Sequence, residues 1–220
     1  SSVPLRFPYV VDASGKADIA SASTTLALAP FAAAIARNDI SAAKNLLAKE
    51  PELQAIPLAR EVANSILTSL TTPALALTAI PATTTTFPLG NLQSASARTG
   101  YGPATRDFVP DPSLLLAAGG KIHPHGLYAH APAEHVWIVD GQWKELTGSA
   151  AVADGHEGSV AFSIVCDGKT VWSTKTTRQG QLIPFKINLT GVKELRLLTH
   201  DGGDGTGSDW WLSLAPLLTR

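Results

Sequence analysis

The pattern of apolar and polar positions divides the chain into two parts. Residues 17–80 hold 18 alanines in 64 positions, and their apolar residues recur at helical spacing. After residue 86, short runs of alternating apolar and polar residues are separated by turn residues. We therefore predict a small α-helical domain over residues 1–85, ending in a linker rich in proline and threonine, and a β domain over residues 86–220.

Proline and capping residues predict short helices in the first part. Pro30 suits the first turn of a helix that continues over 31–37. Asp39 or Ser41 can cap a second helix over 42–49, which the next proline stops.

A third helix is expected from Pro57 to about Thr71. One apolar stripe at four-residue spacing supports it, made by Leu58, Val62, Ile66 and Leu70. The prolines and threonines of 73–88 deny helix and favour extended chain, so this segment is predicted to be a linker or an edge strand.

The β part carries alternation and tight-turn signals. Alternating runs occupy 135–139, 160–166, 169–172, 183–189 and 194–198. Asp167 and Gly168 join two of these runs directly, which is the strongest short-range signal for a hairpin. We predict a mostly β protein whose second domain is an antiparallel β-sandwich.

Charge and composition narrow the partners. The chain has 17 Lys and Arg against 18 Asp and Glu, and no basic face is clustered in the sequence. Such a balance argues against nucleic acid as a partner. No apolar stretch is long enough to predict a membrane span. An uncharged or small ligand fits this composition best.

Cysteine and methionine usage bears on compartment and chemistry. Cys166 is the single cysteine, so no intramolecular disulfide can form, and its alternating strand predicts a small buried apolar residue. The sequence holds no methionine although translation begins with one, so we expect a trimmed N-terminus. Export is the expected route, with the protein secreted, periplasmic or at the cell surface.

Several blocks of the β part follow one another in a recognisable order. They are 89–92, 100–102, 119–131, 158–169, 189–195 and 201–210. Together these blocks resemble the NPCBM family of carbohydrate-binding modules. The resemblance covers about 135 residues and none of residues 1–85, and it departs from the family's pattern at 207–211.

The resemblance implies a jelly-roll sandwich that binds sugars, often galactose-containing glycans. It also implies a structural calcium and attachment to a glycoside hydrolase or another secreted enzyme. The region that includes Tyr128 and His130 is implied to lie near the C-terminal stretch.

Sugar binding needs a flat apolar face for the pyranose ring and fixed polar partners for its hydroxyls. Asp209, Trp210 and Trp211 supply both kinds of group, and strand alternation lets only one of the two tryptophans face a ligand. Arg98, Tyr128 and His130 complete the predicted carbohydrate-binding residues. Both tryptophans could equally be structural, and His130 could simply orient a loop.

The glycine-rich run 201–209 is a second candidate site. Asp201, Asp204 and Asp209 could fold around a hard cation, so we predict Ca²⁺ as a structural ligand of this loop. A solvated loop with Asp-Gly turns is the alternative explanation.

Catalytic motifs are sparse. His123, His125 and His130 could hold a metal, but Pro124 weakens a regular strand there and no His-Glu-x-x-His supplies a base. Gly-x-Ser-x-Gly is absent, and the carboxylates of the β part mostly border turns, so we assign no catalytic residue.

Three functions follow, in order of preference. The first is non-catalytic binding of a neutral glycan or polysaccharide, as a module beside an enzyme domain. The second is a protein-interaction or structural module with the same fold. The third is a metal-dependent hydrolase that uses the histidine cluster.

Overall fold

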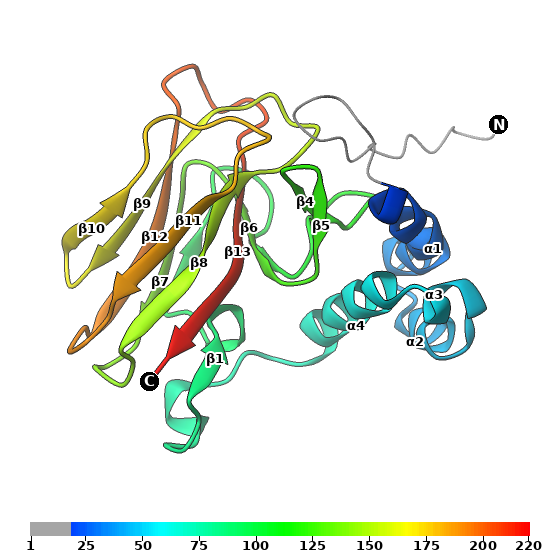
Figure 1. The fold of residues 1–220 in the computed structure, drawn as a ribbon, viewed down its shortest axis with the longest axis horizontal. Helices are drawn as coiled ribbons and strands as arrows, with labels where there is room; N and C mark the ends of the chain where they lie inside the picture. The colour runs from blue at the N-terminus through cyan, green and yellow to red at the C-terminus, as the bar shows by residue number, and fades with distance from the viewer. Residues whose placement is uncertain (1–18) are drawn as a thin grey trace.

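The computed structural model describes residues 19–220, and this part of the chain begins with four α-helices. Their bounds are α1 Ile19–Ala36, α2 Ile40–Lys49, α3 Pro51–Ala55 and α4 Pro57–Thr71. The helices lie together beside the strands, at the right of Figure 1. No helix in residues 19–220 is long and apolar enough to span a membrane. The first 18 residues of the predicted helical domain lie outside the described part.

Two details of the helices differ from what the sequence predicted. Pro30 lies inside α1, so the expected helix start at this residue is wrong. Leu28, Phe31 and Ala34 are buried together on the same helix, and this packing offsets the hydrogen bond that a mid-helix proline removes. The short helix α3 was not predicted, because Pro51 starts it as well as stopping α2.

The other helix boundaries agree with the sequence. Of the two capping candidates, Asp39 caps α2 and accepts a hydrogen bond of 2.9 Å from the Ala42 amide. Helix α4 starts at Pro57 and ends at Thr71 as expected. Its predicted stripe is buried at Val62 and Ile66, whereas the side chain of Leu70 at the helix end is 40% exposed.

The β part forms two antiparallel sheets and a separate hairpin. The larger sheet has the order β11-β8-β13-β6-β3, with β1 also paired to β13. Its strands are β1 Thr86–Pro88, β3 Thr105–Arg106, β6 Gly126–His130, β8 Glu145–Val152, β11 Ile183–Asn188 and β13 Trp210–Thr219. The second sheet, in the order β10-β9-β12-β7-β2, consists of β2 Ser96–Arg98, β7 Ala133–Ile138, β9 Val160–Cys166, β10 Lys169–Ser173 and β12 Glu194–Asp201. The hairpin joins β4 Leu116–Ala118 to β5 Lys121–His123.

The predicted alternation is confirmed in β9, β11 and β12, whereas β7 buries three successive residues and β10 buries none. Every second residue of β9 is buried, and β9 forms a hairpin with β10 through Asp167 (φ 48°) and Gly168 (φ 79°). Both residues are left-handed, as the tight turn requires. The segment 73–88 ends in the strand β1, which pairs with β13, as one of the two alternatives predicted. It also contains a short 3-10 helix, η1 (Leu77–Ala79), which was not predicted.

Three layers follow from the burial pattern. The first core lies between the two sheets and includes Trp137, Trp143 and Trp211. The outer face of the larger sheet is covered by β4 and β5, which bury Tyr128 and Leu212. The other side of this hairpin packs on the helices, in a core that the two parts of the chain share. That shared core contains Leu114, Leu115, Ala117 and Ile122 of the β part beside the helical residues.

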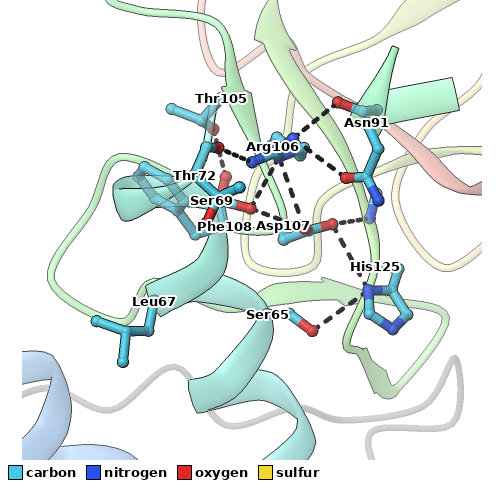
Figure 2. A network of polar contacts seen from close by, with 12 residues as sticks. Ser65, Leu67, Ser69, Thr72, Asn91, Thr105, Arg106, Asp107, Phe108 and His125 are labelled. Carbon is cyan, nitrogen blue, oxygen red and sulfur yellow. Dashed lines mark hydrogen bonds and ion pairs between the residues drawn. The ribbon is translucent and has the colours of Figure 1, made fainter. Parts of the chain in front are cut away.

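Polar contacts also join α4 to the sandwich (Figure 2). Arg106 donates hydrogen bonds to the Ser69 hydroxyl at 3.0 Å and to the Thr72 carbonyl at 2.8 Å. Its third guanidinium nitrogen, Nη1, donates to Asn91 Oδ1 and to the Gly90 carbonyl. Both residues belong to the 3-10 helix η2 (Leu89–Asn91). Four groups, from the end of α4 and from η2, therefore converge on one half-buried cation.

Candidate functional site

Three of the predicted site residues meet on the outer face of the larger sheet. Antiparallel pairing places Trp210 of β13 opposite His130 of β6, and Leu212 opposite Tyr128. The rings of Tyr128 and Trp210 meet edge to face, with centroids 5.2 Å apart. Tyr128 is buried, and burial raises its pKa to about 12. Tyr128 and Trp210 therefore form a fixed aromatic pair beside a histidine.

His130 is held in one orientation. Its Nδ1 lies 2.9 Å from the Ala131 carbonyl, which can only accept, so Nδ1 carries the proton and donates. The Thr99 hydroxyl donates to the His130 carbonyl and accepts from the His130 amide, both at 3.1 Å. This arrangement leaves Nε2 as the unprotonated ring nitrogen of a histidine that is 8% exposed.

Trp211 has a different environment from Trp210. It is 2% exposed and packs between the sheets, with its ring centroid 5.0 Å from that of His135. Alternation along β13 requires this split, since neighbouring residues of a strand point to opposite faces. Trp211 is thus a core residue, and Trp210 is the tryptophan on the outer face.

Two aromatic residues that the sequence reasoning did not assign lie at the same place. His156 stacks on Trp210 with ring centroids 3.7 Å apart and an interplanar angle of 15°. Tyr101 is 76% exposed, and its ring meets that of His130 edge to face at 5.8 Å. A tyrosine between Gly100 and Gly102 was the signal for an exposed ring, since neither glycine can cover it. We call Tyr101, Tyr128, His130, His156 and Trp210 the aromatic site.

Arg98 does not contact the aromatic site through its side chain. It ends β2, at the edge of the second sheet, with its backbone opposite Glu134 of β7. Its side chain is exposed and forms no hydrogen bond or ion pair with another residue of 19–220. Thr99 follows it directly, so Arg98 is one residue away from the contacts of His130.

Asp209 is fully buried and holds two segments together. Its Oδ1 accepts a hydrogen bond of 2.9 Å from the Ser159 amide, and its carbonyl accepts from the Ala131 amide. Its Oδ2 is buried without a hydrogen-bond partner in the described residues. Burial raises the pKa of this carboxyl. A Cβ at position 158 would lie 2.2 Å from the Ser208 carbonyl, so only glycine permits this approach.

The predicted calcium ligands do not form a metal site. Asp204 instead pairs with Arg178 at 2.7 Å and accepts a hydrogen bond from the Ser159 hydroxyl, and these contacts lower its pKa. Asp201 is exposed, whereas Asp209 is buried against Ser159. Across residues 19–220 there is no group of three His, Cys, Asp or Glu that could hold a metal ion. The carboxylates in this arrangement do not fit calcium.

The three histidines of the alternative metal hypothesis are also separated. His123 lies 3.2 Å from the Ala118 carbonyl, and burial lowers its pKa. His125 faces Glu61 and Asp107 at the helix junction, and His130 belongs to the aromatic site. The described residues therefore offer no three-histidine zinc site.

Comparison with protein families assigns the β part. The model of the NPCBM/NEW2 domain matches residues 85–216. The chain belongs to the NPCBM/NEW2 domain family. The match covers the aromatic site and leaves the four helices outside, which confirms the resemblance seen in the sequence. A search of curated proteins found no match.

Several solved structures similar to this NPCBM/NEW2 domain are CBM51 modules. The CBM51 from Clostridium perfringens GH95, solved with methyl-galactose, is 26% identical over 61% of this chain and 100% of its own, with a TM-score of 0.57. A structure from Clostridium perfringens ZmpB that contains the M60 catalytic domain with CBM51-1 and CBM51-2 is 23% identical, with a TM-score of 0.55. The match to it covers 61% of this chain but 15% of the ZmpB chain.

A third similar structure, CBM51-2 with GlcNAc and INT domains from Clostridium perfringens ZmpB, is 19% identical with a TM-score of 0.55. It covers 61% of this chain and 31% of that one. The predicted fold class, an antiparallel sandwich preceded by a helical region, is therefore confirmed, and the fold is that of a carbohydrate-binding module.

Proposed function

We propose that this chain binds a neutral glycan, galactose-containing or related, at the aromatic site and catalyses no reaction. It acts as a module of an exported carbohydrate-active or cell-surface protein, beside an enzyme domain. Arg98, next to Thr99 in the sequence, is a further polar group proposed to bind sugar hydroxyls.

The exposed ring of Tyr101 beside the oriented imidazole of His130 is the observation that carries the proposal. A tyrosine that is 76% exposed offers its face to the C–H side of a pyranose ring. His130 Nε2 supplies a polar partner for a hydroxyl. Apolar area with a few fixed polar groups is the usual composition of a small-ligand site.

Trp210 supports the other rings of this surface. His156 covers one face of its indole and Tyr128 meets it edge on, so Trp210 holds these two rings in place. A ligand on the aromatic site would therefore contact Tyr101, His130 and His156 first. The sequence analysis instead predicted that a tryptophan would contact the ligand directly.

The similar CBM51 supports the sugar class. It was solved with methyl-galactose and is 26% identical to this chain. Calcium is not part of the proposal, because Asp204 is paired with Arg178 and Asp209 with Ser159.

A glycan array with the whole chain tests the proposal, run once with calcium and once with a chelator. We expect binding to galactose-containing or related neutral glycans under both conditions. Tyr101→Ala should weaken binding about three- to tenfold, since an aromatic contact is worth ~0.5–1.5 kcal/mol beyond its buried area.

Val171→Ala, at an exposed position of the edge strand β10, is the matched control and should bind like the wild type. Saturable binding to protein alone would favour the interaction-module hypothesis. Turnover of a glycoside or ester that a chelator abolishes would favour the hydrolase.

A further inference from the structure

A cavity of about 360 Å³ lies where α4 meets the sandwich, away from the aromatic site. Helix α4 contributes Asn64, Ser65 and Thr68 to its wall. The sandwich contributes apolar residues, among them Pro88, Pro216 and Leu217. The family match begins at residue 85, so the α4 side of this wall belongs to the helical region outside it.

Two of the seven non-glycine residues of 19–220 with left-handed backbone line this cavity. Asp107 (φ 64°) and Ala215 (φ 45°) both line it and both have the left-handed backbone that residues with a Cβ rarely adopt. At the same place β13 shifts register against β8, between Leu214 and Leu217. Bulges and strained residues recur at binding sites, where the surrounding contacts hold them in place.

The strained residues are held by specific contacts, which makes the cavity wall rigid. Asp107 accepts hydrogen bonds from the Gly126 amide at 3.0 Å and the Ser69 hydroxyl at 2.8 Å. The Ala215 amide donates to the His125 carbonyl at 3.0 Å. Figure 2 shows how Asp107, Arg106 and His125 face α4 from the sandwich side.

The polar groups that remain available are uncharged. The side chains of Asn64 and Thr68 are exposed and make no hydrogen bond with another residue of 19–220. The charges nearby already face one another, since Arg106 lies 4.0 Å from Asp107 and His125 lies 3.5 Å from Glu61. An amide and a hydroxyl opposite an apolar wall suit C–H groups on one side of a ligand and hydroxyls on the other.

We propose that this junction cavity is a second binding site, which takes an uncharged, hydroxyl-rich small molecule such as a monosaccharide or a polyol. Its volume falls within the range of about 300–1,000 Å³ that small-molecule sites occupy, and such sites favour the boundary between packed units. The helical region then has a role in binding, because α4 supplies the free polar groups.

The test is a titration of the whole, ¹⁵N-labelled chain with D-galactose, N-acetylglucosamine and glycerol, followed by NMR. At least one probe should give saturable shifts at the Asn64 side-chain amide and at the Gly90 and Gly126 backbone amides. We expect a dissociation constant on the order of 1 mM for a molecule of this size. The Trp210 indole reports separately on the aromatic site.

Thr68→Trp fills the cavity from an exposed position of α4 and should weaken these shifts at least about tenfold, a loss of about 1.4 kcal/mol. Leu70→Trp, on the same helix but outside the cavity wall, is the matched control and should leave them unchanged. Asn64→Ala is the second variant, for use if Thr68→Trp lowers the melting temperature.

No saturable shift at the three cavity amides with any probe would overturn this inference. Shifts that persist equally in Thr68→Trp and Asn64→Ala would also overturn it. Shifts confined to the Trp210 indole would support the proposed function while rejecting the second site, so the two failures are distinguishable.

Discussion

Trp210 and Trp211 are adjacent in the sequence, yet the pleat of β13 gives them opposite surroundings. Trp211 is 2% exposed between the sheets, whereas Trp210 contacts Tyr128 and His156 on the outer face. A core tryptophan contributes mainly buried volume, and a surface tryptophan contributes ring contacts. The two residues should therefore respond differently to truncation.

Trp211→Ala is expected to lower the free energy of unfolding by ~3–5 kcal/mol, because it leaves a cavity in the core. Trp210→Ala should cost less, about 1–2 kcal/mol, while weakening glycan binding by releasing His156 and Tyr128. Urea unfolding and glycan binding of both variants measure this split. Equal losses of stability would contradict the assignment of the two faces.

His135 makes folding stability depend on pH. It is 3% exposed, its Nε2 has no hydrogen-bond partner among residues 19–220, and burial lowers its pKa to about 4 from the ordinary 6.5. The unfolded chain then binds the proton more readily, so stability falls as the pH drops from the unfolded pKa toward the folded one. A shift of this size corresponds to about 3 kcal/mol.

His135→Leu should remove this loss between about pH 7.5 and about pH 4, measured as the change in unfolding free energy relative to the wild type. His200→Leu makes the same change at an exposed position of β12 and should keep the wild-type dependence. An unaltered pH profile in His135→Leu would show that the buried imidazole is not the cause.

At the scale of elements, α4 is fixed to the sandwich by polar and apolar contacts together. His125 lies 3.5 Å from Glu61 of α4, 3.8 Å from Asp107 and 3.3 Å from the Ser65 hydroxyl. The hydrogen bond with Asp107, together with the charges of both carboxylates, raises the pKa of His125. When it is protonated, His125 bridges a carboxylate on the helix and one on the sandwich.

Docking of α4 should accordingly weaken as the pH rises. Because the folded pKa is raised, this contribution is fully present below the unfolded pKa and is lost as the pH passes the folded value. Hydrogen exchange over 57–71, corrected for intrinsic rates, should quicken between about pH 5.5 and about pH 8.5. In the His125→Gln variant, the corrected exchange rate over 57–71 should be the same at both pH values. If the rate still rises with pH in this variant, the His125 bridge is not the cause.

At the scale of the molecule, the helices and the sandwich are more closely joined than the sequence indicated. Leu114, Leu115, Ala117 and Ile122 belong to the β part but are buried in the helical core. Arg106 adds two hydrogen bonds across the same boundary, to Ser69 and Thr72. The division into two domains near residue 86 stays a prediction. The hairpin of β4 and β5 packs against both parts.

A chain that begins at Thr86 tests this boundary. We expect a cooperative melt, since ~135 residues bury an adequate core, but at a lower temperature than the whole chain because the hairpin loses its cover. Replacing Leu115 and Ile122 by serine should improve the solubility of the short chain and destabilise the whole one. Calorimetry measures the stability, and the soluble fraction after centrifugation measures the solubility. An unfolded short chain would show that the helices are an integral layer of one domain.

The candidate site was only partly predictable. Tyr128, His130 and Trp210 were expected to lie together, and the pairing of β6 with β13 brings them to one face. Tyr101 and His156 were missed because they come from loops that precede β3 and β9. Nothing local in the sequence states which loops end beside the same strand.

The sequence by itself determined the fold class, the Asp-Gly hairpin, the limits of α4 and the family, since each depends on near neighbours or on motifs in fixed order. Only the tertiary structure decided which tryptophan faces outward, where Asp204 finds its partner, and which core holds Leu115. Those outcomes depend on strand order and on contacts between distant segments. A carboxylate at 204 pairs with Arg178 because the fold brings the two loops together, and no periodicity in the chain encodes that distance.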